Sequence, residues 1–438
     1  MDFEVSLRPY LSEGEIALLL HALEGTPSHC LVLQTKKMSD ETLLSLYPRL
    51  SPHPFVPHAY YYKKEEYDFG KSLLYDAGVI SIQDASSMMV PFLLNPKPGE
   101  RILDLCAAPG GKSILASLLM NDEGVILAND ISFPRAKAMS SNVERTGRGN
   151  IIVNSSDFSF SATEYAGYFD KIILDAPCSG SAMFRKNPQA KEEWSPSKLR
   201  RCVKTQRELL EIASTMLAPG GVLAYSTCSF SYEENEENIL WFLERHPEFS
   251  MKIAPIDSPL FFHSKTLKEA IHFFPHRFDG EGQFLALLQK DGILFHQPEK
   301  KSACPLEGKF SGFLKEYGLE NRHNFALRDK FYSLTEAFRF SHLNTLRAGV
   351  KLFELRDIFL PDHALARYLT SEHSLPLSSD QARQYLRGET FPLEKNDGFY
   401  IVSYCDLNLG WIKVTKGVAK NHYPKGLRRD YPLRNSSL

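Results

Sequence analysis

The sequence predicts an α/β protein whose largest part is a doubly wound domain, with helices on both faces of a mostly parallel sheet. From Gly99 onward, short apolar runs alternate with stretches of helical periodicity, which is the pattern of repeated βαβ units. The 438 residues leave room for several domains of roughly 100 to 200 residues each. No apolar run approaches the roughly 20 residues of a membrane-spanning helix. We therefore expect a central sheet domain flanked by smaller domains.

The strands and helices of the sheet domain can be placed from the apolar runs. The expected strands are Arg101–Cys106, Gly124–Asp130, Asn150–Ser156, Phe169–Asp175 and Gly221–Cys228. Helices are expected at Ser113–Met120, Pro134–Arg145 and Ser197–Leu217. Strands and helices that alternate in this order indicate a Rossmann-like, doubly wound sheet.

The flanking segments have a different composition. Residues 1–72 combine a helical stretch at Glu15–Leu23 with a proline-rich, aromatic segment at 51–57, which favours a small α+β module. A polar stretch at Gln297–Ser302 is typical of a linker. We expect the sheet domain at 73–290, a linker and accessory region at 291–380, and a last small domain at 381–438. The segment Gly410–Arg429 interleaves basic with aromatic residues, which favours an RNA-binding surface over a merely solvated one.

Composition excludes several classes of protein. Hydrophobic residues make up 43% and charged residues 24% of the chain, as in ordinary globular proteins. The seven cysteines have irregular spacing and no CxxC pair, so we expect reduced thiols and no metal site. The start of the chain has no basic and apolar signal sequence, so we expect a cytoplasmic protein. The formal net charge of −2 gives no overall attraction to nucleic acid, and any basic surface must be local.

The segment DLCAAPGGK at residues 104–112 lies where a strand is expected to end and a helix to begin. Ligands of doubly wound sheets bind at such strand ends, where glycines allow the backbone to approach the ligand closely. The GxxxxGK(S/T) spacing of a P-loop is absent. A tight turn without a ligand is the simpler explanation of this motif alone, and a lone strand-end aspartate is more often a cap. Together with Asp130 and Asp157, whose carboxylates can accept hydrogen bonds from ribose hydroxyls, the motif favours an adenosine site.

Two cysteines follow the next strands, within DAPCSG at 175–180 and STCS at 226–229. A single strand-end cysteine is usually a small buried apolar residue, but two at one sheet edge indicate reactive chemistry. Asp175 ends an apolar run, so partial burial would favour its protonated form. Such a set suits methylation of cytosine at carbon 5. A thiolate adds to carbon 6, an acid at nitrogen 3 stabilises the developing charge, and carbon 5 then attacks a sulfonium methyl group.

These motifs resemble those of the Nop/Sun RNA (cytosine-5) methyltransferases. The matching segments are DLCAAPGGK at 104–112, DAPCSG at 175–180, Met183–Lys186, and YSTCSF at 225–230 with the acidic stretch Glu233–Asn238. Gln83–Ser87 and His276–Phe284 resemble the family's lead-in and closing strand, so the resemblance covers about 73–290.

The resemblance implies a Rossmann-like methyltransferase domain that uses S-adenosyl-L-methionine. It implies that Cys228 is the nucleophile that bonds to carbon 6, and that Cys178 assists product release. The acid at the base would be Asp175. The implied cofactor contacts are Cys106, Ala107, Ala108, Pro109, Gly110, Gly111, Lys112, Asp130, Arg135, Asp157 and Asp175.

The last segment, from Tyr385 to Arg429, resembles the PUA-like domain of the bacterial 16S ribosomal RNA methyltransferase F subgroup. This resemblance implies 16S ribosomal RNA or the small ribosomal subunit as the partner, with RNA also contacted by the N-terminal module. We expect the target cytosine to be unstacked, because carbon 6 is unreachable inside a stacked helix. We expect a monomer without a membrane or DNA partner.

Several alternatives stay open at this point. A tRNA cytosine-5 methyltransferase would use the same motifs, and a catalytically idle ribosome-assembly factor would keep the fold without needing both cysteines and Asp175. A DNA cytosine-5 methyltransferase has its nucleophile in Pro-Cys-Gln, whereas serine follows Pro177-Cys178 here. An amino methyltransferase needs an Asp/Asn-Pro-Pro-Tyr loop, which the fourth strand lacks.

Overall fold

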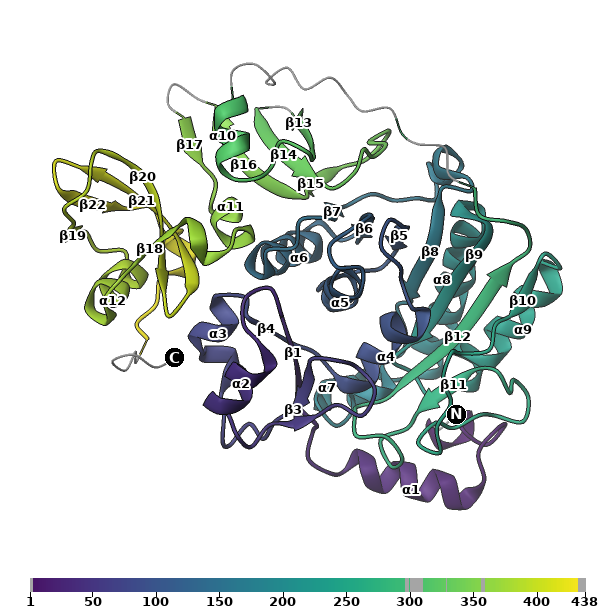
Figure 1. Ribbon diagram of the computed structural model, residues 1–438. Coiled ribbons are helices and arrows are strands. Elements are labelled where there is room, and N and C mark those ends of the chain that lie inside the picture. Colours follow the sequence, from purple (N-terminus) through teal and green to yellow (C-terminus); the bar gives the residue numbers. More distant parts are fainter. Residues whose placement is uncertain (1–2, 296–298, 300–309, 328, 356–358, 432–438) are drawn as a thin grey trace.

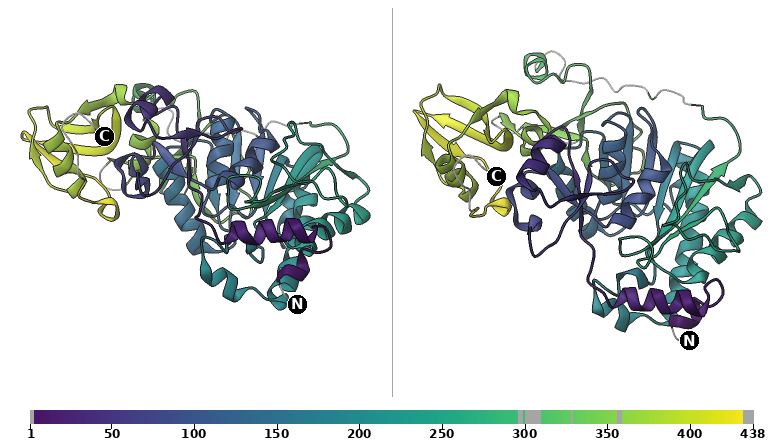
Figure 2. Two further views of the ribbon diagram at one scale, coloured as in Figure 1. Left: turned by 90° about the horizontal axis from the view of Figure 1, so that it is seen from below. Right: turned by 60° about the horizontal axis from the view of Figure 1, so that its bottom comes forward.

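The computed structural model describes residues 3–295, 299, 310–327, 329–355 and 359–431 (Figure 1). A nine-stranded sheet forms the centre, a four-stranded sheet lies in the N-terminal part, and sheets of four and five strands lie in the C-terminal part. Figure 2 shows the C-terminal sheet at one end of the molecule and helix α1 on the other side of the central domain. Most of the linker expected at 297–302 lies outside the described residues. Within the described part, no helix is long and apolar enough to span a membrane.

The central sheet has the strand order β10-β12-β9-β8-β5-β6-β7-β15, and β11 pairs with β12. Its parallel strands confirm the predicted ones: β5 (Arg101–Asp104), β6 (Val125–Asn129), β7 (Ile151–Asn154), β8 (Phe169–Asp175) and β9 (Leu217–Thr227). Antiparallel strands extend both edges: β10 (Phe249–Met251), β11 (Ile271–Phe273), β12 (Gln283–Lys290) and β15 (Thr345–Ala348). The strand order reverses at β5, so the carboxyl ends of β5 and β8 lie beside a switch point where ligands of such sheets bind.

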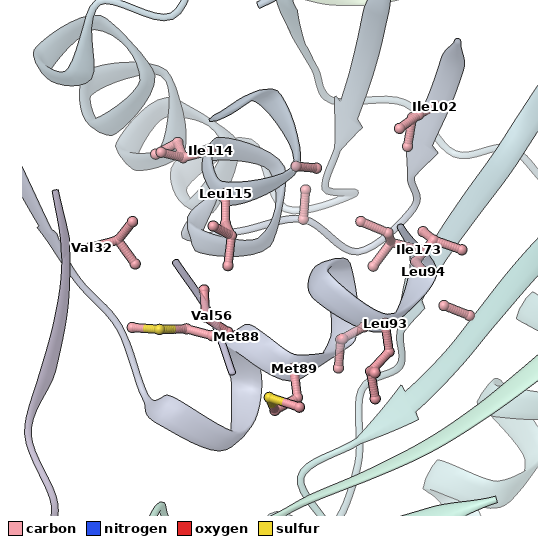
Figure 3. Close-up of a cluster of buried hydrophobic side chains, with 14 of the residues drawn as sticks. Val32, Val56, Met88, Met89, Leu93, Leu94, Ile102, Ile114, Leu115 and Ile173 are labelled. Atoms are coloured by element: carbon pink, nitrogen blue, oxygen red, sulfur yellow. The ribbon is translucent and has the colours of Figure 1, made fainter. Parts of the chain in front are cut away.

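Helices cover both faces of this sheet, because successive strand residues point to opposite sides. One face packs against α4 (Ala85–Leu94), α5 (Gly111–Leu119) and α6 (Phe133–Thr146), and the other against α8 (Pro196–Met216) and α9 (Glu236–Arg245). On β5, Ile102 packs into the first cluster and its neighbour Leu103 into the second. Figure 3 shows Leu93 and Leu94 of α4 near Ile173 of β8 in the first cluster. The three predicted helices are confirmed by α5, α6 and α8.

The N-terminal part is α+β, as expected. It begins with η1 (Phe3–Ser6) and α1 (Glu13–Leu23), and Glu15 of α1 accepts hydrogen bonds from His276 and Arg277 of the sheet domain. The small sheet has the order β2-β3-β1-β4. Its elements are β1 (Cys30–Leu33), α2 (Asp40–Leu46), β2 (Ser51–Pro52), β3 (Ala59–Tyr61), η2 (Phe69–Lys71), α3 (Leu73–Asp76) and β4 (Ile80–Ile82). Because β4 closes this sheet, the sheet extends past the boundary expected at residue 72.

The C-terminal part forms two further units. The first contains α10 (Ser311–Glu316), β13 (His323–Leu327), β14 (Lys330–Leu334), β16 (Val350–Leu355) and β17 (Phe359–Pro361), and the intervening β15 joins the central sheet beside β7. The second begins before residue 381, the boundary expected from the sequence. It contains α11 (His363–Tyr368), η6 (Ser371–His373), β18 (Ser374–Pro376), α12 (Ser379–Arg387), β19 (Phe391–Pro392), β20 (Gly398–Tyr404), β21 (Leu407–Thr415), β22 (Val418–Asn421) and η7 (Lys425–Leu427).

The basic and aromatic tail does not present all of these side chains to solvent. Trp411 and Tyr423 are buried in the C-terminal core, so neither ring is available to stack on a nucleobase. Arg429 lies 3.3 Å from the carboxylate of Asp76 in α3, and the hydroxyl of Tyr431 donates a hydrogen bond to the same carboxylate. Part of the expected RNA-binding pattern is therefore a structural junction between the last domain and the N-terminal module. Exposed positive charge remains at Lys416, Lys420 and Lys425.

Asp104, the last residue of β5, is a fully buried carboxylic acid. Its Oδ2 accepts a hydrogen bond of 2.6 Å from the hydroxyl of Ser113, which ties the strand to α5, and its Oδ1 has no hydrogen-bond partner in the described chain. Burial raises the pKa of Asp104 to about 7, although the hydrogen bond from Ser113 and the charge of Lys112 act in the opposite direction. The folded protein therefore favours the neutral acid at this position.

The substitution Asp104→Asn should stabilise the cofactor-free protein at neutral and alkaline pH. A raised pKa means that the stabilisation from the neutral acid is complete below the unfolded-state pKa of about 4 and is lost as the pH rises through about 7. Asparagine stays neutral, so its advantage in free energy of unfolding should grow by on the order of 2 to 4 kcal/mol over this range. Urea unfolding of both proteins from pH 5 to pH 8 measures it. A difference that does not change with pH would contradict the burial account.

Candidate active site

A cavity of about 510 Å³ opens at the carboxyl edge of the central sheet. Its walls come from the loops that follow β5, β6, β7, β8 and β9 and from one side of α8. The cavity is large enough for a nucleoside-sized ligand. The predicted site residues that line it are Cys106, Ala108, Asp130, Arg135, Asp157, Asp175, Cys178 and Cys228.

The glycine-rich segment forms the tight turn expected between β5 and α5. Gly110 has a φ of +103°, and a Cβ at this position would lie 3.0 Å from the side chain of Met139 in α6, so glycine is needed here. The N–H of Ala107 donates a hydrogen bond of 2.7 Å to the carbonyl of Asn129, which joins this turn to the end of β6. Ala107, Pro109, Gly110 and Gly111 shape the turn but do not line the cavity.

The two strand-end aspartates differ in how free their oxygens are. Asp130 is buried, and its Oδ2 has no hydrogen bond, although Arg135 Nη1 lies 3.2 Å away. Arg135 also donates a hydrogen bond of 2.9 Å to the carbonyl of Ala108, so it links this carboxylate to the glycine-rich turn. Asp157 accepts hydrogen bonds from the N–H and the hydroxyl of Ser159, so its carboxylate caps a local turn while it lines the cavity. Asp130 is thus the aspartate with a free buried acceptor.

Lys112 is turned away from the cavity and pairs with Asp175. Its Nζ lies 2.7 Å from Asp175 Oδ2 and also donates a hydrogen bond to Ser87. Burial on its own would lower the pKa of Lys112, but the attraction and hydrogen bond of Asp175, together with the charges of Asp104 and Cys228, raise it above its ordinary value. The lysine is therefore held in its charged form.

Asp175, expected from the sequence to be a protonated acid, accepts hydrogen bonds from three side chains in the structure. Besides the lysine, Asp175 Oδ1 accepts hydrogen bonds of 2.8 Å from Ser226 and from Gln283. The expectation considered burial alone, whereas the lysine partner lies 63 residues away in the sequence and meets Asp175 only in the fold.

The two cysteines lie side by side, with 2.9 Å between their sulfur atoms and no disulfide bond. A hydrogen bond to the sulfur of Cys228, followed by burial, raises the pKa of Cys178 well above its ordinary value. This direction keeps the proton on Cys178, which can then donate to the sulfur of Cys228. The charged Lys112 also attracts a thiolate at Cys228. The arrangement thus contains one sulfur suited to be a nucleophile and a second suited to carry a proton.

Several residues that shape the site were missed from the sequence. Asn129 donates hydrogen bonds to the carbonyls of Leu105 and Ser156, which organises the ends of three neighbouring strands. Gln283 and Ser226 orient Asp175, and a fully buried carboxylate, Glu234, lies behind the cysteines. Each belongs to a motif segment or strand end, but its role follows from contacts across the fold.

The residues present fit S-adenosyl-L-methionine. Asp130 offers a buried acceptor for ribose hydroxyls, and its Oδ2 lacks a hydrogen-bond partner in the described chain. Apolar side chains of Leu105, Ile131 and Leu209 line the same cavity and suit a nucleobase. The cavity continues from these residues to both cysteines, so one end can hold an adenosine while the other faces the reactive sulfurs.

Comparison with known families identifies two parts of the chain. The family described as 16S rRNA methyltransferase RsmB/F matches residues 91–289, and the methyltransferase RsmF PUA domain matches residues 372–429. The match to the PUA domain begins near β18, in agreement with the fold. These matches confirm the predicted fold class of a Rossmann-like methyltransferase domain followed by a PUA-like domain.

Similar solved structures cover mainly the catalytic part. A methyltransferase homolog protein from Pyrococcus horikoshii is 30% identical with a TM-score of 0.57, and the match covers 66% of this chain and 93% of that one. NSun6 from Pyrococcus horikoshii, solved with SFG, has a TM-score of 0.59 over 66% of this chain and 98% of that one. At 21% identity, this second match concerns the fold alone.

Curated relatives match over nearly their full length. Ribosomal RNA small subunit methyltransferase F of Enterobacter sp. (strain 638) is 30% identical over 428 residues, covering 91% of this chain and 89% of the relative. The protein of that name from Escherichia coli (strain K12) is 31% identical over 420 residues, with coverage of 88% and 86%. The chain therefore belongs to the ribosomal RNA small subunit methyltransferase F family, and it is an S-adenosyl-L-methionine-dependent methyltransferase.

Proposed function

We propose that the protein methylates carbon 5 of cytosine in 16S ribosomal RNA through a covalent bond between Cys228 and carbon 6. The observation that carries the chemistry is the pair of sulfurs 2.9 Å apart at the end of a nucleoside-sized cavity. A methyltransferase that modifies an exocyclic amine or a hydroxyl has no use for two such thiols. The names of the curated relatives support the choice of small-subunit RNA. We propose that it acts as a cytoplasmic monomer.

Each residue of the site has a role in this reaction. When bound, the cofactor supplies an electrophilic methyl group. The thiolate of Cys228 adds to carbon 6, and the electron pair released into the ring makes carbon 5 nucleophilic. Lys112, kept charged by its partner, stabilises the thiolate of Cys228 through its positive charge. Asp175, as a carboxylate, accepts a hydrogen bond from the exocyclic amine. A water molecule takes the proton from carbon 5, the bond between carbon 6 and sulfur breaks with its electron pair left on Cys228, and Cys178 donates its proton to that sulfur.

A basic face of α8 supports an RNA path toward the cavity. Thr205 lines the cavity, and Arg201 lies one helical turn before it on the same side of the helix. Arg200 and Lys204 are exposed next to this line. Neither arginine forms an ion pair with any described residue, so both are free to contact phosphates. We propose that these three side chains bind the backbone next to the flipped cytosine.

The substitutions Cys228→Ala and Cys178→Ala should block different steps. With small ribosomal subunits and radiolabelled S-adenosyl-L-methionine, Cys228→Ala should lose 5-methylcytosine formation by on the order of 10³-fold or more, because no adduct can form. Cys178→Ala should transfer the methyl group but accumulate a protein–RNA adduct that survives denaturation. Methylation by Cys228→Ala would refute the mechanism. Label in tRNA but not in small subunits would leave the chemistry intact and refute the substrate.

Removing the basic face of α8 should weaken RNA binding in a salt-dependent manner. For the double variant Arg200→Ala/Arg201→Ala, the slope of log Kd against log salt should become less steep by about one per lost phosphate contact. The control is Lys252→Ala, which removes an exposed lysine beside the outer strand β10. Filter binding of small-subunit RNA at several salt concentrations measures both slopes. Equal slopes in the double variant and the control would exclude this path.

A further inference from the structure

Glu234 is a fully buried carboxylate directly behind the two cysteines. It ends η5 (Tyr232–Glu234), in the acidic segment that follows β9. The proposed mechanism gives it no role, since it does not line the cavity. Burial of a carboxylate costs free energy unless hydrogen-bond donors surround it. The donors that surround Glu234 therefore indicate its structural role.

The donors to Glu234 come from both cysteine loops. Its Oε1 accepts hydrogen bonds from the N–H of Ser179, at 2.8 Å, and from Gln206 Nε2, at 2.9 Å. Its Oε2 accepts from the hydroxyl of Ser179, at 2.6 Å, and from the hydroxyl of Ser229. Ser179 directly follows Cys178, and Ser229 directly follows Cys228. One carboxylate therefore joins the residues that come immediately after the two sulfurs.

Two neighbouring side chains form further hydrogen bonds with the cysteine loops. Gln206 of α8 uses the same amide nitrogen to bond the carbonyl of Pro177, which precedes Cys178. Asn235, next to Glu234, accepts a hydrogen bond of 2.6 Å from Thr227 and donates one of 2.8 Å to the carbonyl of Ser229. The residues on both sides of each cysteine are thus fixed by Glu234, Asn235 and Gln206.

We propose that Glu234 is a positioning residue for the two-cysteine reaction: it holds the loops of Cys178 and Cys228 at a fixed separation. The inference rests on the proposed function, because it assigns the two sulfurs their separate roles. The positioning role is supported because Glu234 accepts hydrogen bonds from the residue that follows each cysteine.

The charge of Glu234 also acts on Cys178. The pKa of Cys178 is raised by the hydrogen bond to Cys228 first, then by burial and by the charge of Cys228, and the charge of Glu234 adds in the same direction. Neutralising Glu234 removes one of the contributions that oppose a thiolate at Cys178. Cys178 should then ionise at lower pH.

The test compares Glu234→Gln with Glu237→Gln. Glu237 lies in the same segment and loses the same charge, but it pairs with the exposed side of Arg207 and contacts neither cysteine loop. In single-turnover reactions, Glu234→Gln should slow adduct formation by on the order of tenfold to a hundredfold, the cost of misplaced reacting groups. Its affinity for S-adenosyl-L-methionine, measured by calorimetry, should stay within about twofold of wild type, since Glu234 lies outside the cavity.

A second measurement separates positioning from loss of structure. Iodoacetamide labelling, read for each cysteine by mass spectrometry, should modify Cys178 at lower pH in Glu234→Gln than in the wild type or in Glu237→Gln. Adduct formation at the wild-type rate would overturn the inference, and so would a loss of cofactor affinity that parallels the loss of activity. The labelling needs no RNA, so it remains a test of Glu234 even if wild-type protein methylates no cytosine and the proposed function fails.

Variants of the donors keep the inference falsifiable if Glu234→Gln does not fold. Ser179→Ala and Ser229→Ala each remove one hydroxyl donor, and each should slow adduct formation several-fold without changing cofactor affinity. When Glu234→Gln folds, adding either serine substitution should slow adduct formation little further, because both serines act through the carboxylate of Glu234. Wild-type rates in both serine variants would overturn the inference.

Discussion

The parallel register between β8 and β9 is the constraint on which the site depends. Asp175 pairs with Ser226 in this register, so the loops after both strands leave the sheet at the same level and bring Cys178 and Cys228 together. A shift of one residue would turn every side chain of a strand to the other face. The buried apolar residues on both faces, such as Ile173 and Leu174, fix the register against such a shift. The core of the sheet therefore sets the distance between the reactive sulfurs.

Charges are arranged on two sides of this pair of sulfurs. The pair of Lys112 and Asp175 lies toward the glycine-rich turn, and Glu234 lies behind the loops. Lys112 attracts negative charge at Cys228, and the charge of Glu234 is one of the contributions that oppose a thiolate at Cys178. In the reaction that we propose, these contacts give two neighbouring thiols different roles. Each buried charge is stable because several donors or an opposite charge surround it.

Sequence patterns were sufficient for the strands, the main helices and eight of the residues that line the cavity. Apolar runs report which segments are buried in a parallel sheet, and reactive residues gather where such strands end. Contacts between distant segments were not predictable. The lysine partner of Asp175, the donors of Glu234 and the burial of Trp411 all depend on tertiary packing. The burial of Asp175 could be estimated from the sequence, but its partner Lys112 could not.

The most direct test of the account is to trap the covalent intermediate and locate it. Small-subunit RNA that contains 5-azacytidine should form a lasting bond with the nucleophile, because nitrogen at ring position 5 carries no proton whose removal would release the enzyme. After nuclease and protease digestion, mass spectrometry identifies the cysteine that carries the nucleotide. The account predicts the bond at Cys228 and none at Cys178. A bond at Cys178, or no bond with RNA that the enzyme methylates, would contradict it.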